Sequence, residues 1–343
     1  MKLGLVGYQG SGKSTIFELL TENAPDAAKA HVGQIGSAFF PDERFDKLVK
    51  LYQPKKKTPA RIELFDTPGL SRDSRSNNAQ RLGIIREATA LIQVIGVFDG
   101  AEPEAELKEF AEDLVLADLQ AVSNRLQRVR KDATRPRPDR ADLEAEVEAL
   151  EPIEAKLEAG ETTADMQFTK IQDQVTRSFS LLTRKPRLVV LNTAESEVDS
   201  VTISSLEADG HMVVSAPFGL ELEVAQLPED ERALFSAEME LGEPSRGRLL
   251  RAIFALSNQI TFYTCDKKEV RAWLLRQGAN VLEAADSIHT DLARGFIRAE
   301  VMGTEDLLRL GSERDLKAEG LHHLEGKDYL VQDGDEILIR FNV

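Results

Sequence analysis

The stretch Gly7-Tyr8-Gln9-Gly10-Ser11-Gly12-Lys13-Ser14-Thr15 decides the expected fold of this chain. Gly7, Gly12, Lys13 and Ser14 stand at the spacing of a phosphate-binding loop. Glycines there let successive backbone N–H groups turn inward and form an anion-binding nest at a helix start. We expect the Lys13 ammonium to neutralise the β and γ phosphates of a nucleotide and the Ser14 hydroxyl to bind Mg²⁺. The alternative is a glycine-rich turn without a ligand.

The flanking sequence supports this interpretation of the loop. A short apolar segment, residues 2–6, precedes it, and Ile16, Phe17 and Leu20 follow at helical spacing. Further apolar segments of strand length alternate with helix-length segments; they lie at 62–65, 91–98, 187–191 and 212–214. This alternation predicts an α/β fold with a mainly parallel sheet covered on both faces.

Two later regions interrupt the alternation. Apolar residues recur at helical spacing on both sides of a Pro-containing segment, residues 134–139, which predicts an antiparallel helical hairpin inserted into the α/β domain. After residue 258, strand-like segments predict a small mixed domain, with 332–335 as a hairpin turn between strands at 329–331 and 337–341. We therefore expect a nucleotide-binding domain (1–112 and 184–258), a helical hairpin (113–183) and a C-terminal domain (259–343).

A second phosphate-side motif is Asp66-Thr67-Pro68-Gly69, which follows the expected strand 61–65. That position puts Asp66 at the carboxyl edge of the sheet, where α/β folds bind ligands. Asp66 can hold Mg²⁺ through water, and the Gly69 backbone N–H can approach the γ-phosphate. The same tetrapeptide elsewhere would be a plain turn; its place after a strand favours the site.

The base of the nucleotide is expected beside Asn192-Thr193-Ala194-Glu195 and Ser215-Ala216, which follow two predicted strands. GTPases carry Asn-Lys-x-Asp here, and the Asp accepts two hydrogen bonds from guanine. Glu195 is one methylene longer, and unpaired buried donors cost about 1–3 kcal/mol, so we expect ATP to bind better than GTP. A helix-capping role is the alternative for Asn192. The expected nucleotide-binding residues are Gly10, Ser11, Gly12, Lys13, Ser14, Thr15, Asn192, Glu195, Ser215 and Ala216, with Ser14 and Asp66 as metal ligands.

Composition restricts the possible partners. The chain of 343 residues has a formal net charge of −16, which disfavours indiscriminate binding to nucleic acid or anionic lipid. Apolar runs fall short of the ~18 residues that span a bilayer. With one cysteine, Cys265, and an N-terminus unlike a signal peptide, we expect a cytoplasmic monomer without a membrane partner.

One local basic cluster departs from this acidic balance. Seven basic residues gather in the expected hairpin against two acidic ones; the basic residues are Arg125, Arg128, Arg130, Lys131, Arg135, Arg137 and Arg140. They are the candidates for contact with RNA. The alternative is an ordinary solvated helical face.

Nearly the whole chain resembles the YchF or Obg-like ATPase family, which lies in the translation-factor class of P-loop NTPases. The stretches that resemble it are 7–15, 41–48, 53–57, 66–70, 116–119, 288–291, 295–301 and 326–343. The resemblance implies a P-loop domain with an inserted helical hairpin and a C-terminal TGS domain of β-grasp shape. It also implies Mg²⁺-dependent ATP binding, slow hydrolysis and association with ribosomes.

The resemblance assigns Leu70 to the position where many GTPases have a water-orienting Gln, so we expect weak hydrolysis without a partner. Gly10 stands where the family usually has Asn, a residue linked to monovalent-cation stimulation. If residues 31–33 align with the family's Asn-Val-Gly, the metal-binding threonine of the switch falls on Ala27, with Thr21 or Ser37 as possible substitutes. Two alternatives remain: a nucleotide-binding module with little turnover, and a translation factor that uses GTP.

Overall fold

The computed structural model describes residues 2–73, 78–136, 138–194, 200–238 and 244–342. Contacts divide the chain into two compact units, Met1–Ser37 with Glu63–Ala252 and Ala38–Ile62 with Ile253–Val343. The predicted hairpin lies within the first unit. The segment 38–62, which we expected in the nucleotide-binding domain, groups with the C-terminal region. The three-part functional division stays a prediction.

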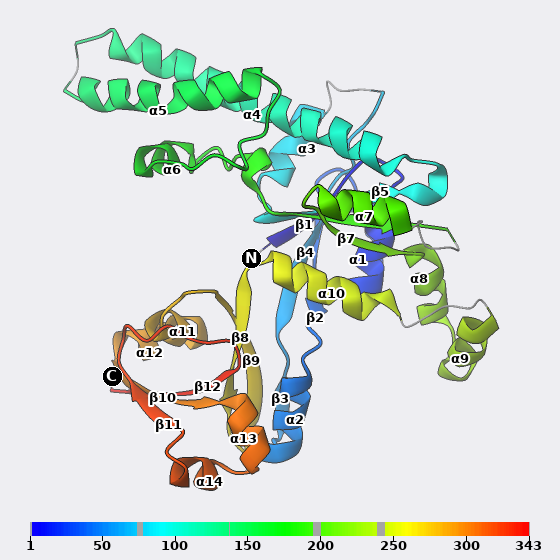
Figure 1. The fold of residues 1–343 in the computed structure, drawn as a ribbon, viewed down its shortest axis with the longest axis vertical. Coiled ribbons are helices and arrows are strands. Elements are labelled where there is room, and N and C mark those ends of the chain that lie inside the picture. The colour runs from blue at the N-terminus through cyan, green and yellow to red at the C-terminus, as the bar shows by residue number, and fades with distance from the viewer. Residues whose placement is uncertain (1, 74–77, 137, 195–199, 239–243, 343) are drawn as a thin grey trace. The chain divides into compact units, whose positions relative to one another are not determined.

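The sheet of the first unit is mainly parallel. In spatial order it contains β2 (Gln34–Phe39), β4 (Arg61–Asp66), β1 (Lys2–Val6), β5 (Ala90–Gly96), β6 (Arg187–Asn192) and β7 (Met212–Ala216) (Figure 1). All pairs from β4 to β7 are parallel. Every residue of β5 is buried, as expected for a central strand covered on both faces. These pairings confirm the predicted parallel sheet.

Helices fill the connections of this sheet. They are α1 (Lys13–Thr21), α3 (Asn78–Ile85), α4 (Pro103–Ala133), α7 (Ser200–Ala208), α8 (Phe218–Gln226), α9 (Glu229–Glu238) and α10 (Ser245–Leu256). Apolar side chains of α3 and α4, among them Leu82 and Phe110, pack against Val6 of β1 and Leu91 of β5. This cluster lies directly beneath the loop that follows β1.

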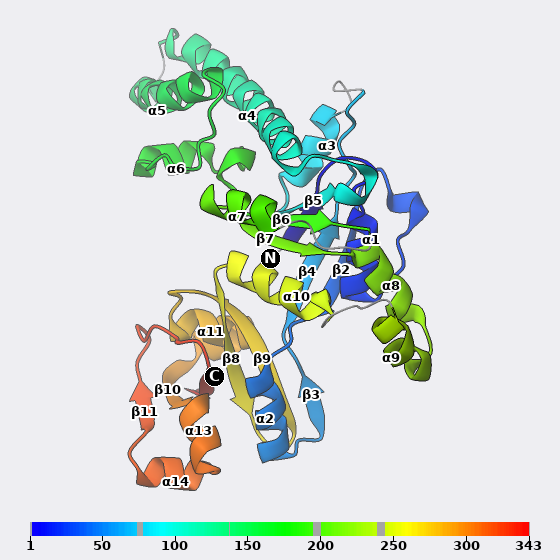
Figure 2. The same cartoon turned by 45° about the vertical axis from the view of Figure 1, so that its right-hand side comes forward.

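The inserted segment is a helical hairpin, as predicted. α4 and α5 (Arg140–Glu158) lie side by side in both views (Figure 1 and Figure 2), and α6 (Lys170–Thr176) packs beside them. Val122 and Leu126 meet Leu150 and Ile153 in a buried cluster. At the base of the hairpin, the fully buried Asp118 accepts hydrogen bonds from Arg86 and from the backbone N–H groups that follow Leu181.

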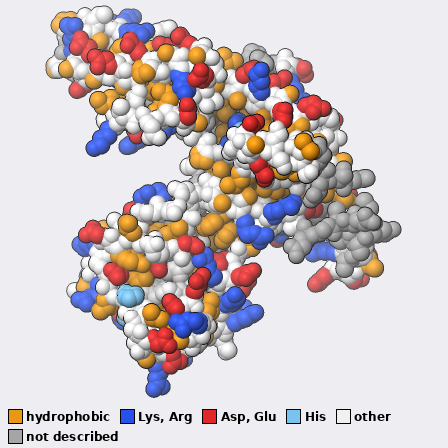
Figure 3. All heavy atoms as spheres, in the orientation of Figure 1, with side chains coloured by type: hydrophobic (Ala, Val, Ile, Leu, Met, Phe, Trp, Pro, Cys, Tyr) orange, Lys and Arg blue, Asp and Glu red, His pale blue; other side chains and the backbone are white. Residues whose placement is uncertain are grey.

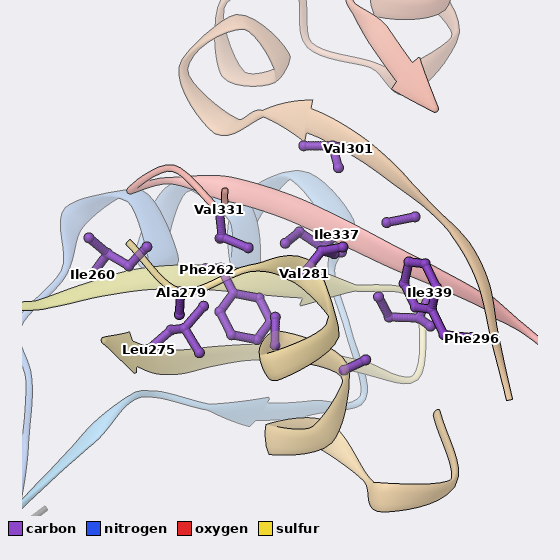
Figure 4. Close-up of a cluster of buried hydrophobic side chains, with 13 residues drawn as sticks. Ile260, Phe262, Leu275, Ala279, Val281, Phe296, Val301, Val331, Ile337 and Ile339 are labelled. Carbon is purple, nitrogen blue, oxygen red and sulfur yellow. The ribbon is translucent and has the colours of Figure 1, made fainter. Parts of the chain in front are cut away.

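The second unit has a sheet with β-grasp topology. Its spatial order is β11 (His322–Glu325), β10 (Phe296–Gly303), β12 (Asp335–Phe341), β8 (Gln259–Cys265), β9 (Glu269–Arg276) and β3 (Lys56–Thr58). β8 pairs parallel with β12 and antiparallel with β9, and α11 (Val281–Ile288) covers one face. Figure 4 shows the buried core under this helix, with Phe262, Val281 and Ile337. Shorter helices complete the unit: α12 (Thr290–Arg294), α13 (Thr304–Leu310) and α14 (Glu313–Ala318).

The predicted hairpin between 329–331 and 337–341 is wrong. Tyr329 O accepts from Val281 N at 2.9 Å, and Val331 N donates to Ala279 O at 3.1 Å, so this segment bonds to the start of α11. The Asp335 carboxylate accepts from Gln332 N at 2.9 Å and from the Tyr329 hydroxyl at 2.8 Å, which closes a compact turn. The Asp335 carboxylate thus holds this segment in a turn, and the turn takes the place of the expected pairing between two strands.

Segment 38–62 is built into the second unit. It contains α2 (Glu43–Tyr52) and β3, which pairs parallel with β9. Arg44 donates two hydrogen bonds to the Asp333 carboxylate, and the Tyr52 hydroxyl contacts Glu336 at 2.8 Å. Across the described ranges, every helix is too short or too polar to cross a bilayer.

Candidate nucleotide-binding site

The loop between β1 and α1 has the backbone of an anion nest. Gly7, Gly10 and Gly12 have φ values of +134°, +82° and +94°, in the region that glycine adopts without strain. A Cβ on Gly12 would lie 2.1 Å from Asn192 Nδ2, so no other residue fits there without movement. The loop can therefore turn its N–H groups toward an anion at the start of α1.

Lys13 lies over this loop. Its side chain is buried, and Nζ donates to Tyr8 O at 2.6 Å and to Ser11 Oγ at 3.4 Å. Burial lowers the pKa of Lys13 to about 8, although the Asp66 carboxylate opposes this change. The hydrogen bonds of the ammonium group go to two neutral acceptors, so a polyphosphate would be a stronger partner.

Ser14 and Asp66, the two predicted metal ligands, are in direct contact. Ser14 Oγ donates to Asp66 Oδ2 at 2.8 Å, while Asp66 Oδ1 is buried without a hydrogen-bond partner in the described part of the chain. Burial raises the pKa of Asp66, and the hydrogen bond from Ser14 and the positive charge of Lys13 oppose that shift. A hydroxyl and a carboxylate with an unsatisfied oxygen are the hard ligands that suit Mg²⁺.

Gly69 stands beside the phosphate loop because the two segments are bonded together. Gln9 N donates to Leu70 O at 2.9 Å, and Leu70 N donates to Gly7 O at 3.0 Å. A Cβ on Gly69 would lie 2.8 Å from Lys13 Nζ. The Leu70 side chain points away, fully buried with Tyr8 and Phe110. An apolar residue therefore fits the core at the position where many GTPases have Gln.

A pocket of about 350 Å³ opens in front of these groups. Lys13, Ser14, Asp66 and Gly69 line it, together with residues from 25 to 34. Three of the segments that line the pocket are ones that we expected from the sequence at a phosphate site: the loop, the start of α1 and the segment 66–69.

Thr21 and Ser37, the possible substitutes for the metal-binding threonine of the switch, do not line this pocket. Ala27, in a 3-10 turn (Ala27–Lys29), lines the pocket without a side-chain oxygen. Thr21 Oγ1 donates to Phe17 O at 2.7 Å within α1, and Ser37 has an exposed side chain on β2. Gln34, which we did not predict, lines the pocket, and its Oε1 accepts from Asp26 N at 2.9 Å. Its lack of a sequence motif explains why it was missed.

Three of the expected base-binding residues, Asn192, Ser215 and Ala216, lie at the carboxyl ends of β6 and β7. Asn192 is paired with Ala216 in the sheet, and its Nδ2 donates to Ser11 O at 3.2 Å. Asn192 Oδ1 and the hydroxyls of Thr193 and Ser215 are buried without partners in the described residues. These polar atoms could bind the edge of a base. Thr15 lies half-buried on α1, and Glu195 lies outside the described residues.

The basic cluster is partly neutralised by the facing helix, because α5 carries seven acidic residues. Ion pairs join Arg125 to Glu146, Arg130 to Glu151, Arg135 to Asp132 and Arg140 to Glu144. Figure 3 shows acidic and basic side chains interspersed over the hairpin. Within the ranges that the structure describes, Arg128 and Lys131 are exposed and have no acidic partner. Arg137 lies outside those ranges.

The parallel sheet, the glycine-rich loop leading into α1 and the Asp66 carboxylate at the sheet edge define a P-loop NTPase fold. Comparison with proteins of known sequence identifies the family. The chain belongs to the YchF and Obg-like ATPase family. A family model described as "50S ribosome-binding GTPase" matches residues 2–125, and one named YchF-GTPase_C, described as a protein of unknown function, matches 259–342.

Relatives cover the whole chain. "Ribosome-binding ATPase YchF" of Bacillus subtilis (strain 168) is 32% identical over 366 residues, which cover 99% of this chain and 99% of the relative. "Obg-like ATPase 1" of Oryza sativa subsp. japonica is 32% identical over 373 residues, covering 100% of this chain and 92% of the relative.

A solved structure of the Schizosaccharomyces pombe YchF GTPase has a TM-score of 0.81 at 22% identity, covering 99% of this chain and 97% of the other. A GTP binding protein from Pyrococcus horikoshii OT3 has a TM-score of 0.63 at 16% identity, with both chains fully covered. These two likenesses concern the fold.

Proposed function

We propose that this chain is a Mg²⁺-dependent ATPase that acts as a nucleotide-controlled switch. The observation that carries the proposal is the convergence of Lys13, Ser14, Asp66 and Gly69 on one pocket. Lys13 and the loop N–H groups bind the phosphates, and Gly69 N–H faces the γ-phosphate. Ser14 and Asp66 hold Mg²⁺, which when bound would neutralise charge on the phosphate oxygens.

ATP is the proposed nucleotide, with GTP weaker. Asn192, Glu195, Ser215 and Ala216 form the proposed base site, and the relatives are named ATPases. Calorimetric titrations with ATP and GTP, at equal Mg²⁺ concentration, test this choice. Tighter binding of ATP is expected, whereas clearly tighter binding of GTP would favour the translation-factor alternative.

Turnover should be slow. Leu70 is buried in the core, and Ala27 offers no metal ligand at the pocket. These two observations also favour a second candidate function, a nucleotide-binding module with little hydrolysis. Phosphate release measured with and without ribosomes separates the two, because an ATPase switch should be stimulated by its partner while the module stays at background.

The proposed partner is the ribosome or another structured RNA, in the cytoplasm, with the chain as a monomer. Relatives are named ribosome-binding ATPases. Within the basic cluster, Arg128 and Lys131 are the strongest candidates, because the other described cations of the cluster already pair with carboxylates. RNA phosphates compete poorly for a cation that a carboxylate holds.

Co-sedimentation with ribosomes tests this contact. We expect the double variant Arg128→Glu/Lys131→Glu to weaken binding about 10-fold or more at low salt, since phosphate contacts dominate such affinities. The control Arg314→Glu/Lys327→Glu makes the same charge change at exposed positions of the second unit. Equal binding by the hairpin variant and the unmodified chain would rule out this surface.

A further inference from the structure

Arg81 of α3 reaches the rim of the phosphate site, although no motif in the sequence marks it. Its Nη1 donates to the Gly69 carbonyl at 2.7 Å. The Gln9 side-chain amide, with its oxygen turned toward this guanidinium, accepts from Nη1 at 3.3 Å and from Nη2 at 3.1 Å. One side chain therefore bridges the phosphate loop and the segment that carries Gly69.

Arg81 has no acidic partner in the ranges that the structure describes. Other arginines of the same unit, such as Arg72 and Arg86, do pair with carboxylates. The Lys13 ammonium lies beside the same glycine, since a Cβ on Gly69 would stand 2.8 Å from Lys13 Nζ. Two cationic side chains are therefore placed around Gly69, where a phosphate would find both.

The contact with Gly69 has a geometric consequence. The peptide between Gly69 and Leu70 is held at both ends, because Arg81 binds its carbonyl and its N–H donates to Gly7 O at 3.0 Å. Glycine otherwise has wide backbone freedom. The preceding N–H, on Gly69 itself, donates no hydrogen bond among the described residues. Fixing the peptide on one side limits the directions in which this free N–H can point.

We propose that Arg81 is a positioning residue for the γ-phosphate: it holds Gly69 so that the Gly69 N–H faces the terminal phosphate. The inference rests on the proposed function and goes beyond it, because it makes recognition of the triphosphate depend on α3. A diphosphate has no group at that position. Arg81 therefore contributes to discrimination between ATP and ADP and to turnover, and leaves the α and β phosphates to the loop.

The test compares nucleotides rather than activity alone. In Arg81→Ala, affinity for a non-hydrolysable ATP analogue and kcat should each fall about 10-fold to 100-fold, the range for losing one charge-assisted hydrogen bond. Affinity for ADP should change by less than about twofold. Arg81→Lys keeps a charge and one donor, so it should recover most of the lost analogue affinity.

Gln80→Ala, at the exposed neighbouring position of α3, is the matched control and should behave as the unmodified chain. Thermal melting of all variants checks that they fold. Equal loss of affinity for the analogue and for ADP, or no loss in Arg81→Ala, would overturn the positioning role. Failure of the unmodified chain to bind either nucleotide would instead remove the proposed function, and this inference with it.

Discussion

Lys13 is a residue whose charge state depends on the site around it. Burial lowers its pKa to about 8, and the side chain is held by a backbone carbonyl and a hydroxyl. A bound triphosphate favours the charged ammonium and raises that pKa again. Nucleotide binding and protonation of Lys13 are therefore coupled.

The coupling predicts a pH dependence of ATP affinity. Below about pH 8, Lys13 is already charged before ATP binds. Above about pH 8, Lys13 must take up a proton when ATP binds. The affinity for ATP should therefore fall about tenfold per pH unit until the pH reaches the pKa of Lys13 in the complex. Titration calorimetry between pH 7 and 9.5 measures this slope. Lys13→Arg is the control, since its guanidinium stays charged and should bind ATP with little slope. A flat profile in the unmodified chain would contradict the coupling.

Residues that belong to a contiguous motif could be predicted from the sequence, because spacing alone places them at a helix start or a strand end. Lys13, Ser14 and Asp66 are of this kind, and the structure brings them together. Gln34, which lines the pocket, and Arg81, which binds the Gly69 carbonyl, could not be predicted, because the local sequence around each carries no phosphate signal. Their places depend on how β2 and α3 pack in the first unit.

Among the elements, α2 and β3 show how side chains attach a segment to a distant domain. The Tyr52 hydroxyl of α2 lies 2.9 Å from Glu313 Oε1 and 2.8 Å from Glu336 Oε1. A hydroxyl has one proton, so it can donate to only one of these carboxyl groups, and the other must donate to it. Glu336 is the buried member of the pair, and burial raises its pKa to about 8.

A protonated Glu336 predicts a pH-dependent stability. Its pKa in the folded chain lies above the ordinary 4.5, so the stability it contributes is complete below about pH 4.5 and is lost as the pH rises to about 8. Glu336→Gln cannot ionise. Between pH 5.5 and 8.5 the melting temperature of the unmodified chain should fall at least about 3 °C further than that of the variant.

The exposed control for this experiment is Glu305→Gln, which should melt with the same pH dependence as the unmodified chain. Parallel melting curves for the unmodified chain and Glu336→Gln across this range would contradict a pKa of about 8 for Glu336. The shared hydroxyl of Tyr52 would then need another explanation.

Elements differed in how well their sequence predicted them. Five strands of the first sheet, from β4 to β7, and the two hairpin helices carry strong apolar patterns and were predicted, whereas β2 at the edge of the sheet was not. β3 (Lys56–Thr58) has no apolar pattern, because its side chains are exposed or half-buried and its pairing with β9 depends on backbone bonds. The segment 329–331 has a strand-like composition, yet hydrogen bonds from Tyr329 and Gln332 to the Asp335 carboxylate hold it in a turn.

At the scale of the whole molecule, the polypeptide passes between the two units three times, after Ser37, Ile62 and Ala252. The first passage follows directly on the residues from 25 to 34 that line the nucleotide pocket. A long-range grouping of this kind is not visible in local sequence, which explains why we expected 38–62 in the nucleotide-binding domain. The alternation of strands and helices predicted the fold class of the first unit, and the strand-like segments after residue 258 predicted a small mixed domain, but neither pattern predicted this division.

The central claim is that Lys13 and the surrounding loop bind a triphosphate whose metal is held by Ser14 and Asp66. Calorimetric titration of ATP with and without Mg²⁺, into the unmodified chain and Lys13→Ala, tests it most directly. The account predicts Mg²⁺-dependent binding by the unmodified chain and a loss of affinity of at least about 100-fold in Lys13→Ala, because a buried charge-assisted contact disappears. Undiminished ATP affinity in Lys13→Ala would contradict it.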